Sequence, residues 1–218
     1  MLPGITYRYA ENGTLERTLK AFGKLSEKLG ASYVTKILDG LNYIHRNDVV
    51  HCNLRAASIL TTKDGSVKLF NFGASCHLRA IEQESPVVVG SPNWASPEVI
   101  ELRGTSTKSD IWSLGCTVIE LLTGQPPYAD TADGKTGAEP FLRLNGFILC
   151  CGAKPISNWW TVRHRMVEND RPPIPKSFRD PLVAFLKECF HKEPAQRPNA
   201  EELLTREWLK SHCGLMKV

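Results

Sequence analysis

The chain has 218 residues, of which 42% are apolar, so it is long enough to bury a full core as one domain or two small ones. Lys and Arg exceed Asp and Glu by only 27 to 23, and this excess is spread along the chain, which excludes a basic arm for nucleic acid or a membrane surface. No segment approaches the ~18 apolar residues that cross a bilayer, and the start at Met1 lacks signal-peptide architecture. The seven cysteines form no CxxC pair, which predicts buried thiols in a reducing compartment and hence a cytoplasmic protein.

The first third of the chain predicts a short strand and two helices. A strand-like stretch at 5–9 precedes the turn ENG at 11–13, and a helix is expected from about Leu15. A longer helix follows and ends before Asn47, because five apolar residues recur at helical spacing: Val34, Ile37, Leu38, Leu41 and Ile44.

The remaining elements are a hairpin and three further helices. Two short β-like pieces at 58–61 and 67–70 flank the turn KDG, which is typical of a β-hairpin. The stretch STKSDIWSLGCTVIELLTG at 106–124 has capping residues at its start and a terminal glycine, so it predicts a long buried helix. Amphipathic spacing predicts helices at 182–190 and from Asn199 onward. The predicted fold is mostly α with a small β-hairpin.

Ordered motifs along the chain resemble the landmarks of a protein kinase. They include VVHCNLRAASILTT at 49–62, VKLFNFG at 67–73, GSPNWASPEVIE at 90–101, KSDIWSLGCTVIELLTGQPPY at 108–128 and QRPNAEELL at 196–204. Within the family, the sequences of these motifs are most similar to those of septation-initiation serine/threonine kinases and of MAP kinase kinase kinases. The resemblance implies a C-terminal lobe at 14–210, a remnant of the N-lobe strand and hinge at 1–13 with the rest of the N-lobe largely absent, and a tail at 211–218.

The same resemblance assigns the chemical positions. Asn53 stands where the family has its catalytic aspartate, and Arg55 where a lysine touches the transferring phosphate. Ser58 and Asn71 occupy the positions of the two magnesium ligands, and Leu60 joins them in the implied nucleotide site. ATP and Mg²⁺ are the implied cofactors, and loss of both carboxylates predicts weaker metal binding and loss of the base. The competing interpretation is that Asn53 and Asn71 are ordinary turn residues.

Four further residues resemble structural landmarks of the family. Asp110 resembles the buried aspartate that accepts main-chain N–H bonds from the catalytic loop, and His51 resembles the histidine that braces this loop. Glu98 and Arg197 resemble the buried ion pair between the activation segment and the C-terminal helices. A local alternative for Asp110 is a helix N-cap.

The segment at 131–164 departs from the family pattern. It shows neither helical nor strand periodicity, and we consider two origins for it. One hypothesis is that much of 134–164 is translated intron, because its codons could contain splice signals. The other is a genuine loop that presents Phe147, Ile148, Trp159 and Trp160 to a partner. Ser85 and Ser91, upstream of this segment, are candidate phosphorylation sites.

Two functions remain open at this point. The first is a protein-kinase-domain protein with impaired or no activity, either a pseudokinase that binds partners or the product of a degraded gene copy. The second is a serine/threonine kinase that transfers the γ-phosphate of ATP to protein substrates. Both imply protein partners in a signalling pathway, and neither implies nucleic acid or a membrane.

Overall fold

The computed structural model describes residues 10–78, 91–128 and 171–213, and it shows a helix-rich body with four very short strands in this part of the chain. The strand expected at 5–9, Ser85, the segment at 131–164 and the end of the tail lie outside the described residues. The α-helices are α1 (Leu15–Phe22), α2 (Glu27–Arg46), α4 (Pro97–Ile100), α5 (Thr107–Thr123), α7 (Asp180–Cys189), α8 (Ala200–Leu204) and α9 (Glu207–Cys213). The strands are β1 (Val49–Val50), β2 (Ile59–Thr61), β3 (Val67–Leu69) and β4 (Cys76–His77).

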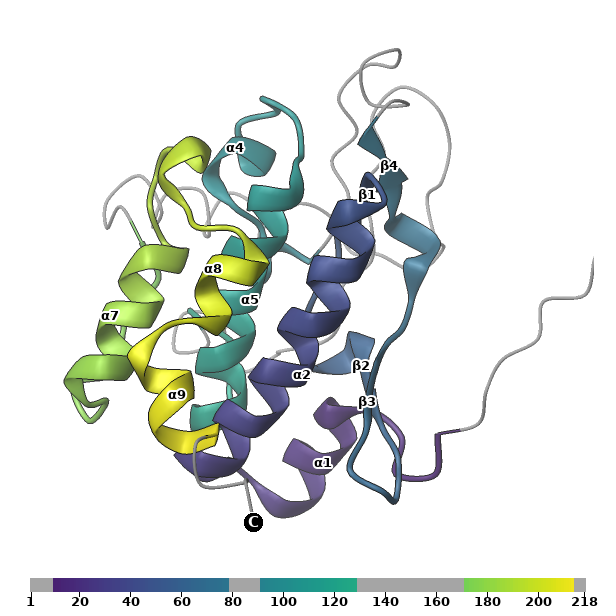
Figure 1. Ribbon diagram of the computed structural model, residues 1–218, viewed down its shortest axis with the longest axis vertical. Coiled ribbons are helices and arrows are strands. Elements are labelled where there is room, and N and C mark those ends of the chain that lie inside the picture. The colour runs from purple at the N-terminus through teal and green to yellow at the C-terminus, as the bar shows by residue number, and fades with distance from the viewer. Residues whose placement is uncertain (1–9, 79–90, 129–170, 214–218) are drawn as a thin grey trace, which may run out of the picture.

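Helix α5 forms the centre of the core. Every residue of α5 from Ser109 to Leu122 is buried, and α5 lies between α7 on one side and α2 on the other (Figure 1). The expected long buried helix is therefore confirmed. The hydroxyl of Ser106 caps α5 by accepting the N–H of Lys108, and Gly124 ends the helix at a positive φ of 80°.

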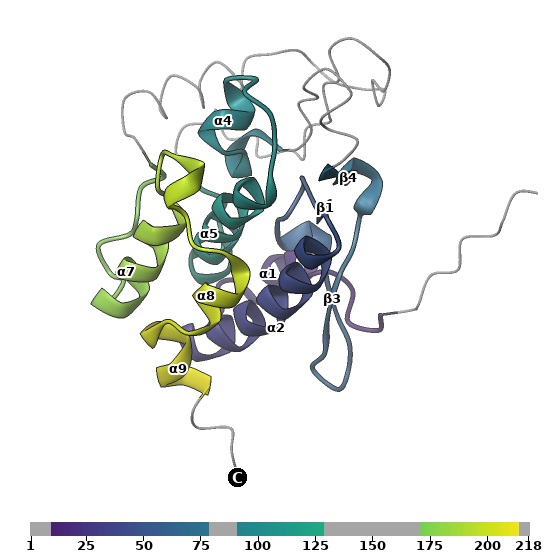
Figure 2. The same cartoon turned by 45° about the horizontal axis from the view of Figure 1, so that its top comes forward.

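Helix α2 joins the core to the C-terminal helices. One face of α2 is fully buried, and α2 packs against α8 and α9 as well as against α5 (Figure 2). The five apolar residues expected on this face are buried or packed against the core. Its end at Arg46 agrees with the prediction.

The predicted hairpin is present as β2 and β3, which pair antiparallel with Ile59 opposite Leu69. A second antiparallel pair, β1 with β4, was not predicted, because each strand is only two residues long and carries no alternating pattern. This pair brings the start of the loop at 51–58 beside the segment that follows β3. None of the described helices has the length and apolar character needed to cross a bilayer.

The single helix expected from Asn199 is instead two helices, α8 and α9. The N–H groups of Thr205 and Arg206 bond three residues back, to Glu202 and Leu203, and the Thr205 hydroxyl also donates to the Glu202 carbonyl at 2.7 Å. Helix α8 ends here because the carbonyls of Glu202 and Leu203 are already bonded to N–H groups three residues later and do not accept those of a further α-helical turn. The break lets Trp208 of α9 pack against Phe185 of α7, with ring centroids 4.9 Å apart.

Candidate functional site

The loop after β1 is fastened to the first turn of α5 by one carboxylate. Asp110 is buried, and its two oxygens accept the main-chain N–H groups of His51 at 2.8 Å and Cys52 at 2.9 Å. His45 of α2 contributes its ring Nε2, 2.8 Å from the same carboxylate. The interpretation of Asp110 as a helix N-cap is wrong, because Ser106 caps α5 and leaves the Asp110 side chain to hold the loop.

His51 connects this loop to the end of β3. Its ring Nε2 lies 3.0 Å from the carbonyl of Phe70, and its Nδ1 accepts the main-chain N–H of Asn53 at 3.3 Å. A carbonyl only accepts, so the proton is on Nε2 and the ring is the neutral tautomer. Burial lowers the pKa of His51, which favours this neutral form. The ring also packs edge-on against Phe72, with centroids 5.0 Å apart.

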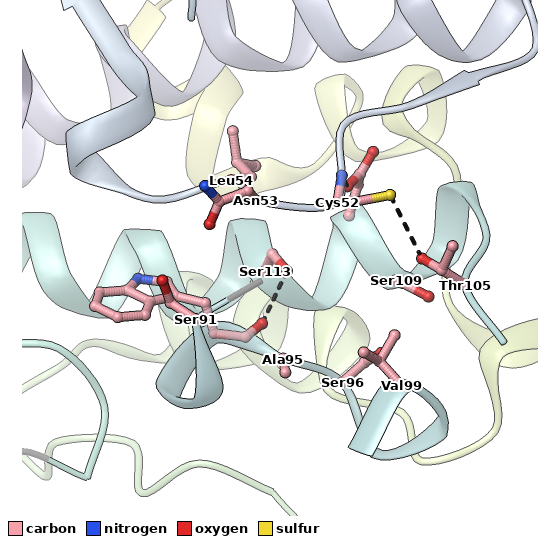
Figure 3. A pocket seen from close by; sticks show the side chains of 12 residues that line it. Cys52, Asn53, Leu54, Ser91, Ala95, Ser96, Val99, Thr105, Ser109 and Ser113 are labelled. Carbon is pink, nitrogen blue, oxygen red and sulfur yellow. Dashed lines mark hydrogen bonds between the residues drawn. The ribbon is translucent and has the colours of Figure 1, made fainter. Parts of the chain in front are cut away.

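The side chain of Asn53 is buried at the wall of a small pocket. It is 3% exposed, and within the described parts of the chain neither its amide oxygen nor its amide nitrogen has a hydrogen-bond partner. The pocket is also lined by Cys52, Ser91 and Trp94, and Figure 3 shows Asn53 across from Ser91. An unpaired buried amide costs free energy, and no hydrogen bond to another described residue offsets this cost.

Ser58, at the position of a magnesium ligand, is hydrogen-bonded within the loop itself. It is fully buried, and its hydroxyl donates to the main-chain carbonyl of Asn53 at 2.6 Å. Its own carbonyl accepts the N–H of Phe70 at 2.9 Å. The hairpin thus places Ser58 opposite Phe70, next to Asn71, so the two residues expected at the metal are brought to one end of the hairpin.

Asn71 has a left-handed backbone, with φ 66° and ψ 54°, between β3 and a short 3-10 turn (Phe72–Ala74). Asparagine tolerates this conformation better than most residues, so the geometry agrees with the turn interpretation and with an altered kinase position alike. The Asn71 side chain makes no hydrogen bond to any described residue. Phe70 and Phe72 on either side are 38% and 43% exposed, which leaves this end of the hairpin open.

These side chains do not fit a magnesium ion. Mg²⁺ requires hard, preferably charged oxygen ligands in octahedral geometry. Asn71 offers one neutral amide oxygen, and Ser58 offers one neutral hydroxyl oxygen that is fully buried and donates its proton to the Asn53 carbonyl. Among the residues that the structure describes, no group of three or more His, Cys, Asp or Glu side chains could hold a metal. Leu60, in β2, lies opposite Lys68 and contributes only apolar surface.

Arg55 makes a cation–π contact with an aromatic ring. Its guanidinium carbon lies 5.6 Å from the centre of the Trp94 ring. Glu120 of α5 joins the loop to the same ring, because it accepts the N–H of Ala56 at 3.0 Å and the indole N–H of Trp94 at 2.9 Å. Burial raises the pKa of Glu120 to about 7. We did not predict Glu120, although one acidic residue in the apolar run CTVIELLTG was a usable signal.

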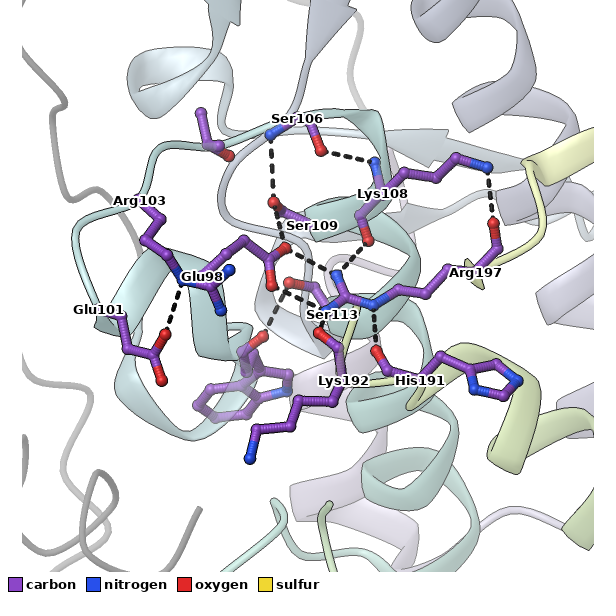
Figure 4. A network of polar contacts seen from close by, with 12 residues as sticks. Glu98, Glu101, Arg103, Ser106, Lys108, Ser109, Ser113, His191, Lys192 and Arg197 are labelled. Atoms are coloured by element: carbon purple, nitrogen blue, oxygen red, sulfur yellow. Dashed lines mark hydrogen bonds and ion pairs between the residues drawn. The ribbon is translucent and has the colours of Figure 1, made fainter. Parts of the chain in front are cut away.

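Glu98 and Arg197 form a buried, two-bonded ion pair (Figure 4). Arg197 is 1% exposed and donates to both carboxylate oxygens, at 2.7 and 2.8 Å. It also donates to the carbonyls of Lys108 and His191 and lies 5.0 Å from the centre of the Trp112 ring. Burial acts to raise the pKa of Glu98, but the hydrogen bonds and charge of Arg197 outweigh it, so this pKa is lowered.

The geometry describes a loop that is rigidly held at Asp110, His51 and Ser58, with one uncommitted amide facing a pocket. The model of the protein kinase domain family matches residues 4–209. The chain therefore belongs to the protein kinase family, which accounts for the kinase-like arrangement of loop, hairpin and helices.

Among individual relatives, two have names that refer to cell division and one is named as a MAP3K-type kinase. The chain is 42% identical to cell division control protein 7 of Schizosaccharomyces pombe over 205 residues, which cover 94% of this chain and 17% of that protein. It is 40% identical to MAP3K epsilon protein kinase 1 of Arabidopsis thaliana over 209 residues, 95% of this chain and 13% of that protein. It is also 40% identical to cytokinesis protein sepH of Aspergillus niger over 205 residues, 94% and 13% respectively. The chain thus spans less than a fifth of the length of these relatives.

Proposed function

We propose that this chain is a protein-kinase-domain protein of the septation type whose phosphotransfer is impaired. The observation that carries the proposal is the state of the Ser58 hydroxyl, which is buried and donates to the carbonyl of Asn53. Together with the neutral amides of Asn53 and Asn71, it leaves the site without a charged group for a base or for magnesium. General-base assistance is typically worth ~10²- to 10⁴-fold in rate, and this is the part expected to be lost.

Each site residue has a part in this proposal. Asn53 occupies the base position and Arg55 contacts phosphate, whereas Ser58, Leu60 and Asn71 form a degenerate nucleotide and metal site. The structural residues are His51, Asp110, Glu98 and Arg197. Their hydrogen bonds support this division. Asp110 accepts the main-chain N–H of His51 and Arg197 donates to Glu98, whereas the buried Asn53 amide has no partner among the described residues.

We also propose a division of the chain into lobes. Residues 14–210 would be a unit like the C-terminal lobe of a kinase, interrupted by an insert at 131–164, with 1–13 a remnant of the small lobe and 211–218 a tail. The preponderance of helices, with only a short hairpin and one other strand pair among the described residues, supports this assignment.

The alternative is an active serine/threonine kinase that phosphorylates proteins. The contacts of Asp110 favour it because they hold the loop, and the Glu98–Arg197 pair favours it because it holds α4 against the segment before α8. An amide at position 53 could still orient a substrate hydroxyl by accepting its hydrogen bond, although it could not take the proton.

Nucleotide binding separates the two functions. We would measure thermal unfolding of the purified chain with ATP alone and with ATP in rising magnesium. Ligand that binds only the folded state must raise the unfolding temperature, so impaired function predicts no increase that depends on magnesium. A magnesium-dependent increase in the unmodified chain, or transfer of ³²P from γ-labelled ATP to casein, would overturn the proposal.

A charge-restoring variant sharpens this test. Asn71→Asp supplies a carboxylate at the exposed end of the hairpin and is expected to create a magnesium-dependent shift with ATP. The matched control is Asn47→Asp, which adds the same charge at the exposed C-cap of α2. A shift of equal size in both variants would mean that the charge acts nonspecifically.

We propose protein partners in a signalling pathway of cell division, based on the names of the relatives. We further propose a cytoplasmic location, since the four cysteines whose state the structure describes are free thiols. Proximity labelling of the full-length protein during division tests both statements. Enrichment of secretory-pathway proteins instead of cytoplasmic kinase-pathway proteins would contradict them.

A further inference from the structure

Two thiols meet where the loop passes the unpredicted strand pair. Cys76 lies in β4 opposite Val50, and Cys52 follows Val50 by two residues. The two sulfur atoms are 3.2 Å apart, and both cysteines are free thiols. A disulfide requires the sulfurs to approach to about 2 Å, a small displacement that rotation of the two side chains can supply.

Accessibility distinguishes this pair from the other described cysteines. Cys52 and Cys76 are partly exposed, whereas Cys116 of α5 and Cys189 of α7 are fully buried. A dissolved oxidant can therefore reach the first pair and not the second. Figure 3 shows the Cys52 sulfur at the edge of the pocket, pointing to the Thr105 hydroxyl, 3.9 Å away.

The surroundings also assign different roles to the two sulfurs. The hydrogen bond from the Cys52 thiol lowers the pKa of Cys76, so Cys76 is the better thiolate. This same hydrogen bond, then burial and the charge of Asp110, raise the pKa of Cys52. Cys76 is thus the group that reacts first with an electrophile, and Cys52 lies beside it to resolve the product.

We propose that Cys52 and Cys76 are an oxidative modification site that takes hydrogen peroxide and forms an intramolecular disulfide. The Cys76 thiolate attacks one peroxide oxygen, the O–O bond breaks, and the products are a sulfenic acid at Cys76 and, after protonation, water. The Cys52 sulfur then attacks the sulfenic sulfur, the S–O bond breaks, and a second water leaves with the proton of Cys52. Two electrons pass from the thiols to peroxide, which is reduced to two waters.

The disulfide would close a loop that contains the residues at the catalytic and metal positions. Positions 52 and 76 are 24 residues apart in sequence, and Asn53, Ser58 and Asn71 all lie between them. The bond would join the loop held by Asp110 directly to β4. Oxidation is therefore expected to restrict the hairpin and the segment after it, and to do so whether or not the site is catalytically active.

Peptide mapping tests the proposal on the full chain. Trypsin releases Cys52 in the peptide 47–55 and Cys76 in the peptide 69–79, each with a single cysteine. After brief treatment with hydrogen peroxide and alkylation of remaining thiols, we expect these peptides to appear joined, with the loss of two hydrogen atoms in mass. Dithiothreitol should restore the separate peptides.

Variants define which outcome counts against the proposal. Cys52→Ser and Cys76→Ser should each abolish the joined peptide, and Cys52→Ser should instead accumulate sulfenic acid at Cys76, detectable with dimedone. Cys116→Ala, a buried control, should leave the joined peptide unchanged. Oxidation that links either cysteine mainly to Cys150, Cys151 or Cys213, or that leaves both as free alkylated thiols in the wild-type chain, would overturn it.

Discussion

The hydroxyl of Ser58 donates to the main-chain carbonyl of Asn53 at 2.6 Å, so two residues expected to serve chemistry are joined in a contact that serves the loop. The bond is fully buried and spans five residues. It fixes the turn between β1 and β2 and uses the single hydroxyl proton of Ser58 within the loop.

Ser58→Ala should therefore destabilise the fold. The variant removes the donor and leaves the buried Asn53 carbonyl without this partner, which costs about 1–3 kcal/mol. Urea unfolding followed by tryptophan fluorescence measures the change. Ser211→Ala, at an exposed position in α9, is the matched control and should change stability by less than ~0.5 kcal/mol. Equal losses in the two variants would refute a special role for the Ser58 bond.

Removal of one member of the Glu98–Arg197 pair should be among the most harmful single changes. Arg197→Met leaves the buried Glu98 charge without its counterion, and such losses cost about 3–5 kcal/mol. Arg103→Met breaks an ion pair with Glu101 in which both side chains are well exposed, so it should cost at most ~1 kcal/mol. Chemical denaturation of both variants gives the comparison. A similar loss for both would show that burial does not decide the cost.

Glu120 should make stability depend on pH. Its pKa is raised by burial to about 7 in the folded protein, above the ordinary 4.5, so the folded state binds the proton more tightly than the unfolded chain. The contribution of this group to the free energy of unfolding is then highest below pH 4.5 and falls as pH rises toward 7, by up to about 3 kcal/mol.

Glu120→Gln isolates that dependence, because glutamine does not titrate and its amide oxygen can still accept the bonds of Ala56 and Trp94. The free energy of unfolding of the variant minus that of wild type should increase as pH rises from 5 to 8. Unfolding curves for both proteins at each pH give the difference, in which the shared titrations of other groups cancel. A difference that stays constant with pH would contradict the raised pKa.

Gly115 of α5 lies against the C-terminal end of α7. A Cβ built there would lie 2.7 Å from a ring carbon of Phe190 and 2.9 Å from Cβ of Cys189, so Gly115→Ala should cost about 1–3 kcal/mol through overpacking. Gly40→Ala in α2 is the control, since its Cβ meets only the Leu69 side chain, at 3.2 Å, and alanine favours the helix. The thermal unfolding temperature of Gly115→Ala should be well below that of Gly40→Ala. The reverse order would show that the helices can separate at little cost.

Long elements with regular apolar spacing could be predicted from the sequence. Helices α2, α5 and α7 are examples, because each presents several apolar side chains to one core, and α2 and α5 also begin at a serine that caps the helix. The β1–β4 pair and the division between α8 and α9 could not, since they depend on contacts between distant residues and on two or three local hydrogen bonds. Helix α4, only four residues long, carried no periodic signal.

The candidate site was predictable in its positions and much less so in its contacts. Ordered motifs located Asn53, Ser58 and Asn71, but their chemical roles stay predictions. Tertiary structure alone showed that the Ser58 hydroxyl is used by the loop and that Glu120 bridges Ala56 and Trp94. The Cys52–Cys76 contact was missed for the same reason, because a strand pair of two residues creates it.

The packing of α5 against α7 has a consequence for how this gene can change. Helices on both sides of residues 129–170 belong to one core, and Glu98 is bonded to Arg197 across 99 positions. The described helices on either side of this segment are therefore held together by contacts among described residues. Since each doubling of a connection costs only about 0.6 kcal/mol of closure entropy, the body can absorb additional coding sequence here with little loss of stability. Such a position allows new sequence to accumulate and be tested without first disabling the fold.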